Sequence, residues 1–186
     1  MRWTQKLMRE VAEDERDNLG LGLWDQLDPY VLSEEHGIPI YRLSEIASTA
    51  AADHFSATTQ SKWSAALVPI GSARVIVEND RHAPVRRRSN IGHELGHFLL
   101  EHAFQAELFG ETHERQFDAK LEKEATFLAG ELLVPFKAVE RMAFDDWPNE
   151  RVALQFGVST QFAQMQMKGQ RVRAKRASHN FQGARF

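Results

Sequence analysis

Residues 86–102 read RRRSNIGHELGHFLLEH, and this stretch decides the fold. Apolar residues recur along it at the three- and four-residue spacing of one helix face. The members of this stripe are Ile91, Leu95, Phe98 and Leu99. The polar residues 81–88 before it contain Pro84 and predict a loop, so that Ser89 or Asn90 is expected to cap the helix.

Two histidines and a glutamate form an HExxH motif inside this predicted helix, at His93, Glu94 and His97. Four residues turn an α-helix by about 400°, so His93 and His97 project from one face and can bind one cation. Glu94 lies about 100° round the helix, where it can take a proton from metal-bound water. A shuffled chain of this composition would contain roughly 0.03 such motifs. Gly96, inside the helix, predicts that another segment packs closely there.

A second helix is predicted over residues 116–134, and it offers carboxylates to the same metal. Its apolar stripe consists of Phe117, Leu121, Ala125, Leu128 and Leu132. Because a catalytic zinc has three protein ligands and one open position, a third ligand is expected. Glu124 lies on the apolar face, where a carboxylate needs a partner, and is favoured as that ligand. Glu122 falls on the polar side beside Lys123, where a solvated surface role is expected.

Other candidates for the third ligand stay open at this point. Glu131 shares the face of Glu124, although a hydrogen-bonding role beside the metal suits it better. Asp118 and His113 are weaker candidates. His102 follows His97 by five residues, about 140° away from the ligand face, so it cannot join His97 unless the helix bends.

Composition limits the class of protein. The 186 residues suffice for one compact domain with a small appendage. The net charge of −3 provides no general attraction to nucleic acid or acidic lipid. Without cysteine, any metal must be bound by histidine or carboxylate. The charged N-terminal segment and the lack of a long apolar run predict a cytoplasmic protein without a membrane span.

The rest of the chain predicts a small sheet and further helices. Segments 65–70 and 73–77 are β-branched and flank Gly71-Ser72, which predicts a hairpin, and Pro69 indicates that its first strand lies at an edge. Further helices are expected from Asp28-Pro29 to Gly37 and over residues 44–55, 137–144, 152–156 and 160–167. The fold class is therefore α+β: a mostly helical, zincin-like domain with a small β-sheet beside the HExxH helix.

The HExxH stretch and the later segment EKEATFLAGELLVPF, residues 122–136, together resemble the ImmA/IrrE family of metallopeptidases of bacteria and their mobile elements. The resemblance extends over residues 30–167. It implies that His93, His97 and Glu124 bind Zn²⁺ and that Glu94 is the catalytic base. It also implies a zinc-dependent endopeptidase that makes a limited cut in a regulatory protein, such as a helix-turn-helix repressor.

The resemblance and the composition also suggest three regions. Residues 1–135 form the expected metallopeptidase domain, residues 136–168 a C-terminal piece similar to a helix-turn-helix, and residues 169–186 a basic, flexible tail. In that piece residues 164–167 replace the family's usual arginine and leucine, which disfavours nucleic acid as a partner. The alternative is a non-proteolytic regulatory module that binds DNA or protein and has a structural or vestigial metal site. An open metal position would favour the peptidase.

Overall fold

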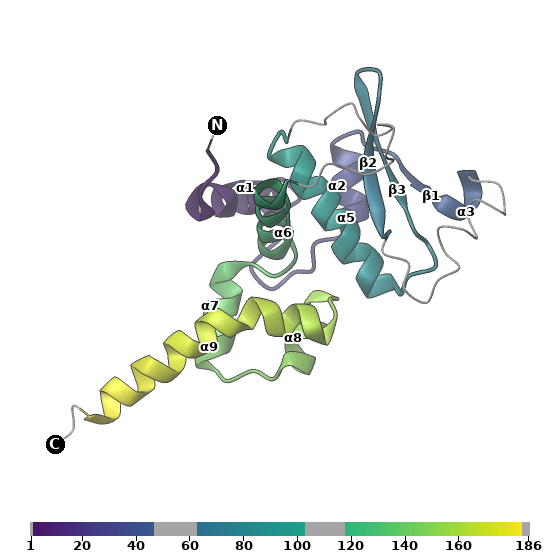
Figure 1. Cartoon of the computed structure of the whole chain (residues 1–186). Coiled ribbons are helices and arrows are strands. Elements are labelled where there is room, and N and C mark those ends of the chain that lie inside the picture. Colours follow the sequence, from purple (N-terminus) through teal and green to yellow (C-terminus); the bar gives the residue numbers. More distant parts are fainter. Residues whose placement is uncertain (1, 47–62, 103–117, 184–186) are drawn as a thin grey trace.

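A computed structural model describes residues 2–46, 63–102 and 118–183. It confirms an α+β fold in which helices surround a small three-stranded sheet. In Figure 1 helix α5 (Pro84–Leu99) lies between the sheet and helix α6 (Ala119–Leu133), and both neighbours contact it. Within the described ranges, no helix is both long and apolar enough to cross a bilayer.

The sheet contains β1 (Ile40–Arg42), β2 (Ala65–Ile70) and β3 (Ala73–Glu78) in the order β1-β3-β2. Strands β2 and β3 form the predicted antiparallel hairpin, whose turn contains Gly71 at a φ of 59°. Strand β1 pairs with β3 in parallel. Strand β2 is therefore an edge strand, which confirms the prediction from Pro69.

Helix α5 begins earlier than the sequence analysis expects. Pro84 occupies the first turn, because its fixed φ suits a helix start and its missing N–H would have had no partner there. Residues 84–88 are thus helical rather than a loop. Ser89 does not cap the helix, and its hydroxyl instead donates to the carbonyl of Val85.

Helices α5 and α6 approach very closely at Gly96. A Cβ at this position would lie 2.7 Å from the carbonyl oxygen of Ala125 and 3.1 Å from its Cα. Fully buried Ile91 and Leu95 of α5 and Leu128 of α6 belong to the same core. The close packing predicted at Gly96 is confirmed, and it brings the polar faces of the two helices together as well.

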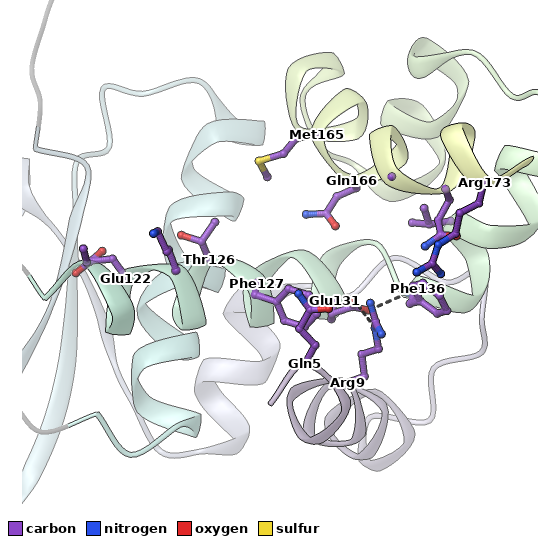
Figure 2. A pocket seen from close by; sticks show the side chains of 15 residues that line it. Gln5, Arg9, Glu122, Thr126, Phe127, Glu131, Phe136, Met165, Gln166 and Arg173 are labelled. Carbon is purple, nitrogen blue, oxygen red and sulfur yellow. Dashed lines mark hydrogen bonds and ion pairs between the residues drawn. The ribbon is translucent and has the colours of Figure 1, made fainter. Parts of the chain in front are cut away.

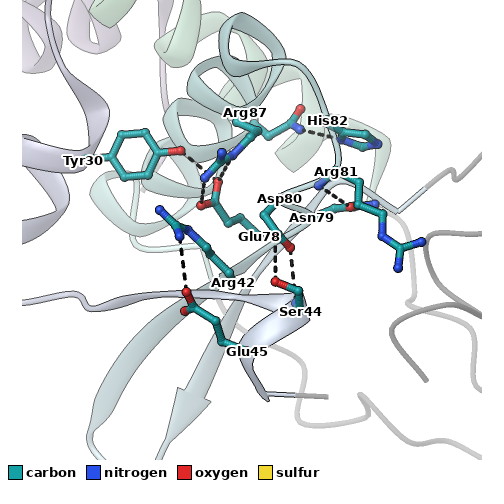
Figure 3. A network of polar contacts seen from close by, with 11 residues as sticks. Tyr30, Arg42, Ser44, Glu45, Glu78, Asn79, Asp80, Arg81, His82 and Arg87 are labelled. Carbon is teal, nitrogen blue, oxygen red and sulfur yellow. Dashed lines mark hydrogen bonds and ion pairs between the residues drawn. The ribbon is translucent and has the colours of Figure 1, made fainter. Parts of the chain in front are cut away.

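A buried ion pair joins α5 to the sheet and to helix α2 (Pro29–Glu35), as Figure 3 shows. The guanidinium of Arg87 donates to both carboxylate oxygens of Glu78, whose side chain is 2% exposed. The Tyr30 hydroxyl donates to the same carboxylate at 2.9 Å. Burial, together with the negative charge of Glu78, raises the pKa of Tyr30 to about 12. These contacts fix the start of α5 against β3.

The two N-terminal helices pack against the pair of α5 and α6. Helix α1 (Gln5–Asn18) contacts α6, and α2 follows the Asp28 cap and ends at Glu35, two residues before the predicted stop at Gly37. Short helix α3 (Leu43–Ile46) overlaps the start of the helix expected over residues 44–55, and the remainder of that segment lies outside the described residues.

The C-terminal helices are α7 (Phe136–Phe144), α8 (Asn149–Phe156) and α9 (Thr160–Gly183). Helix α9 contacts both of the others. It continues well past Met167, although residues 169–186 were expected to form a flexible tail. The extension is held by buried Ala174 and by Arg171, which donates to the carbonyl of Trp147 at 2.7 Å.

Candidate metal centre

The two histidines of the HExxH motif point to the same place, as the helical spacing predicts. Both lie in the last turns of α5, and their Nε2 atoms are 3.1 Å apart. The side chain of His97 is 5% exposed, whereas that of His93 is 24% exposed. The pair therefore lies at the boundary between core and solvent.

Glu122, in the first turn of α6, completes this cluster. Its carboxylate oxygens lie 3.0 Å from Nε2 of His93 and 3.4 Å from Nε2 of His97. Among the described residues, these three side chains form the one group of metal-ligating type whose ligand atoms all lie within 4.8 Å of one another. The expectation of a solvated Glu122 is corrected: its side chain is 20% exposed and faces the histidines.

The distances in this cluster fit a metal ion. In a tetrahedral zinc site with bonds of about 2.0–2.1 Å, neighbouring ligand atoms are about 3.3 Å apart. The three separations here are 3.0, 3.1 and 3.4 Å. Two imidazole nitrogens and a carboxylate are also a ligand set that zinc accepts. His93, His97 and Glu122 could therefore hold a zinc ion.

Glu124 does not join the cluster, although it is buried as predicted. Its carboxylate lies 3.4 Å from Nε2 of His102. His102 in turn reaches His97, Nδ1 to Nδ1, at 3.0 Å. The sequence analysis expected that His102 could meet His97 only if the helix bends. In the structure α5 ends at Leu99 and the chain turns back through Glu101, whose φ is 52°.

These contacts form a chain with a consistent hydrogen-bond direction. If Nε2 of His97 binds a metal, its Nδ1 carries the proton and donates to Nδ1 of His102. Nε2 of His102 then carries a proton directed toward the Glu124 carboxylate 3.4 Å away, a contact that does not meet hydrogen-bond geometry. Burial lowers the pKa of His102, and Glu124 opposes this effect. Glu124 is therefore connected to the cluster through His102 rather than directly.

Glu94 lies on the sheet side of α5. Its side chain is buried, and Oε2 accepts a hydrogen bond from the backbone N–H of Leu67 in β2 at 2.9 Å. This contact holds the carboxylate between the helix and the edge strand. The role of Glu94 as the catalytic base stays a prediction.

A comparison with protein families identifies the chain. Residues 33–168 match the model of a peptidase family described as the IrrE N-terminal-like domain. The chain belongs to this family. Curated proteins provide no match. The family consists of metallopeptidases that generally depend on zinc, which agrees with the resemblance noted from the sequence and with the chemistry of the cluster.

The remaining ligand candidates of this IrrE-like domain have structural roles or lie outside the described residues. Glu131 accepts from Nε of Arg9 and from the backbone N–H of Phe136. Burial raises the pKa of Glu131, and Arg9 opposes this effect. Asp118 caps α6 by accepting from its first N–H groups. His113 lies outside the described residues.

Proposed function

We propose that the protein is a zinc metalloendopeptidase that makes a limited cut in a regulatory protein, such as a helix-turn-helix repressor. The observation that carries the proposal is the cluster of His93, His97 and Glu122 beside a buried Glu94. The family supports the hydrolysis of peptide bonds. The repressor substrate rests on the resemblance of the sequence to the ImmA/IrrE family.

In this proposal His93, His97 and Glu122 hold the zinc ion, and Glu124 orients His97 through His102. Zinc at such a site supplies a Lewis acid for the peptide carbonyl and makes water more acidic. Glu94 accepts the proton of the attacking water and passes it to the departing amine. The backbone N–H of Leu67 positions the carboxylate for this transfer.

The partial exposure of the cluster favours a peptidase over a structural metal site. A structural zinc is enclosed by four protein ligands, whereas a catalytic zinc keeps one position open. Of the described residues, three converge here, and the side chains of His93 and Glu122 are 24% and 20% exposed. A water molecule and a peptide carbonyl can approach from that side.

The edge of β2 offers a place for an extended substrate, because an added strand pairs with backbone groups. Leu67 donates to Glu94, so its N–H points away from β3. Pro69 faces the same way and has no N–H to offer. We therefore expect the substrate backbone to donate mainly to carbonyl oxygens of this edge.

The test is cleavage of helix-turn-helix repressors encoded beside the gene, followed by mass spectrometry. The parent protein with zinc should produce two defined fragments. Glu94→Gln should bind zinc normally and reduce turnover by at least about 100-fold, because the general base is lost. Cleavage by Glu94→Gln at the parent rate would remove Glu94 from the mechanism, and a lack of fragments with every repressor would count against the proposed substrate.

A further inference from the structure

A groove of about 700 Å³ begins at the metal cluster and runs between α6 and α9 toward α1 and α7. Glu122 and Thr126 line its near end, and the Thr126 hydroxyl lies 3.4 Å from Nδ1 of His93. Figure 2 shows Arg9 of α1 and Phe136 of α7 at the far end of the groove, near Arg173 of α9. Cavities of this size accommodate ligands, and this one opens beside Glu122 of the metal cluster.

The walls of the groove combine apolar and polar side chains. Phe127 of α6 and Met165 of α9 supply apolar surface, and Met165 is 50% exposed. Gln170 lines the same space but is only 9% exposed, and its side-chain Oε1 has no hydrogen-bond partner among the residues that the structure describes. A buried amide without a partner is costly. A hydrogen-bond donor from an occupant of the groove, such as a peptide N–H, would remove that cost.

The groove also has excess positive charge. Three cations line it, Arg9, Lys123 and Arg173, and its two carboxylates are Glu122 and Glu131. Arg9 pairs with Glu131 at 3.0 Å, and Glu122 belongs to the metal cluster. Within residues 2–46, 63–102 and 118–183, neither Lys123 nor Arg173 has an ion-pair partner. Two cations therefore remain for an acidic occupant.

We propose that this groove binds the part of the substrate next to the cut bond, and that it selects a segment in which apolar and acidic side chains alternate. The inference rests on the proposed peptidase function and adds a substrate preference to it. Phe127 and Met165 contact the apolar side chains, Gln170 accepts from the peptide backbone, and Lys123 and Arg173 attract the acidic side chains.

Gly169 allows a direct test, because it lines the groove and a Cβ there would meet no atom within 4 Å. Gly169→Trp fills the groove and, by replacing glycine in a helix, should not weaken α9. Val172→Trp is the matched control, since Val172 lies on the same helix, is 47% exposed and does not line the groove. Thermal unfolding and zinc content should be unchanged in both variants.

The probes are three fluorescein-labelled decapeptides with a central Leu-X-Leu-X core between Gly-Ser flanks, X being Glu, Gln or Lys. Their affinity is measured by fluorescence anisotropy at low salt with full-length, zinc-loaded Glu94→Gln protein, which does not consume them. The Glu peptide should bind at least about tenfold more tightly than the Gln peptide, and the Lys peptide most weakly. Gly169→Trp should abolish this binding, and Val172→Trp should retain it.

Charge reversal tests the acidic preference separately. Arg173→Glu should shift the preference toward the Lys peptide, whereas Arg176→Glu, on the exposed part of α9 outside the groove, should not. Equal affinity for the three peptides, or binding unaffected by Gly169→Trp, would overturn the groove proposal. Binding of the Glu peptide without cleavage of any repressor would support the groove and count against a repressor as the substrate. Cleavage of a repressor together with equal affinity for the three peptides would support the peptidase and overturn the groove proposal.

Discussion

Glu122 and Glu124 are two positions apart in α6 and face different parts of the site. Glu122 lies at the boundary with solvent and meets Nε2 of both histidines. Glu124 is buried and faces His102, behind His97. A catalytic metal must remain accessible to water and substrate, so the boundary position suits a ligand and the buried position suits a residue that orients one.

Zinc binding should separate these two roles. Glu122→Ala should retain less than about a tenth of the zinc after dialysis, because a ligand is lost. Glu124→Ala should weaken zinc binding by roughly 10-fold to 100-fold, because His102 loses the partner that orients it. Elemental analysis and titration with a zinc indicator measure both effects, with Lys123→Ala as the control on the same helix. Full zinc in Glu122→Ala and none in Glu124→Ala would restore the ligand set that the sequence resemblance implied.

The sequence could predict most of this cluster but not that Glu122 faces the two histidines. The HExxH spacing alone was enough to bring His93 and His97 together, because both lie on one helix. The apolar stripe of α6 correctly indicated that Glu124 is buried. It carried no information on which side of α6 faces α5, and burial was treated as a sign of metal binding.

At the scale of elements, the contact between α5 and α6 depends on Gly96. Alanine usually stabilises a helix interior by about 1 kcal/mol over glycine. Here the new Cβ would lie 2.7 Å from a backbone oxygen of α6, so Gly96→Ala should instead destabilise the protein by about 1–3 kcal/mol. Because α6 also carries Glu122, zinc affinity should fall as well.

Gly92→Ala is the matched control for this prediction, since its nearest neighbour would be a leucine side chain at 3.4 Å. Urea unfolding should show a neutral or stabilising effect for Gly92→Ala and a lower midpoint for Gly96→Ala. Equal midpoints for the two variants would mean that α6 can move away at little cost.

The buried pair of Glu78 and Arg87 connects the sheet to α5, and its loss should be costly. Hydrogen bonding to Glu78 raises the pKa of Arg87, so its guanidinium stays charged. Glu78→Gln leaves that charge without its partner and should destabilise the protein by about 3 kcal/mol. Glu45→Gln is the control, because it breaks an ion pair with Arg42 in which both side chains are 56% exposed. It should destabilise the protein by less than about 0.5 kcal/mol. Similar urea midpoints for the two variants would contradict this assignment.

Strong local signals predicted the elements well, and the errors occurred where tertiary contacts decide. The hairpin around Gly71 and the helix between Asp28 and Gly37 follow from turn and cap residues next to each other in the chain. The start of α5 was placed too late because Pro84 was taken as a loop residue rather than as the first residue of a helix. The extent of α9 depends on Arg171 reaching Trp147, a contact that no local pattern reveals.

At the scale of the whole molecule, the proposed zinc would link α5 to α6 across the core. A ligand that binds only the folded state stabilises it, by about 4 kcal/mol at 1,000 times its dissociation constant. Removal of zinc with a chelator should therefore lower the melting temperature by roughly 10 °C, measured by circular dichroism. Glu122→Ala should show almost no difference with and without chelator. Identical melting of the parent protein under both conditions would argue against a zinc site.

The groove could not be predicted from the sequence, because it forms between α6 and α9, which are far apart in the chain. Residues 164–167 were noted in the sequence only as departures from the family pattern. In the fold, Met165 and Gln166 line the groove, whereas Met167 enters the core. Met165 and Gln166, which depart from the family pattern, thus change a surface beside the metal cluster.

The hydrogen bond from the Leu67 amide to Glu94 provides a natural reporter of where the Glu94 carboxylate lies. A backbone amide on an edge strand exchanges its hydrogen with solvent readily unless another group covers it. Here the covering group is the side chain proposed to act as the base, so slow exchange at this amide indicates that the carboxylate is in position. Deuterium uptake at Leu67 would follow the arrangement of the active site in protein that has no substrate at all.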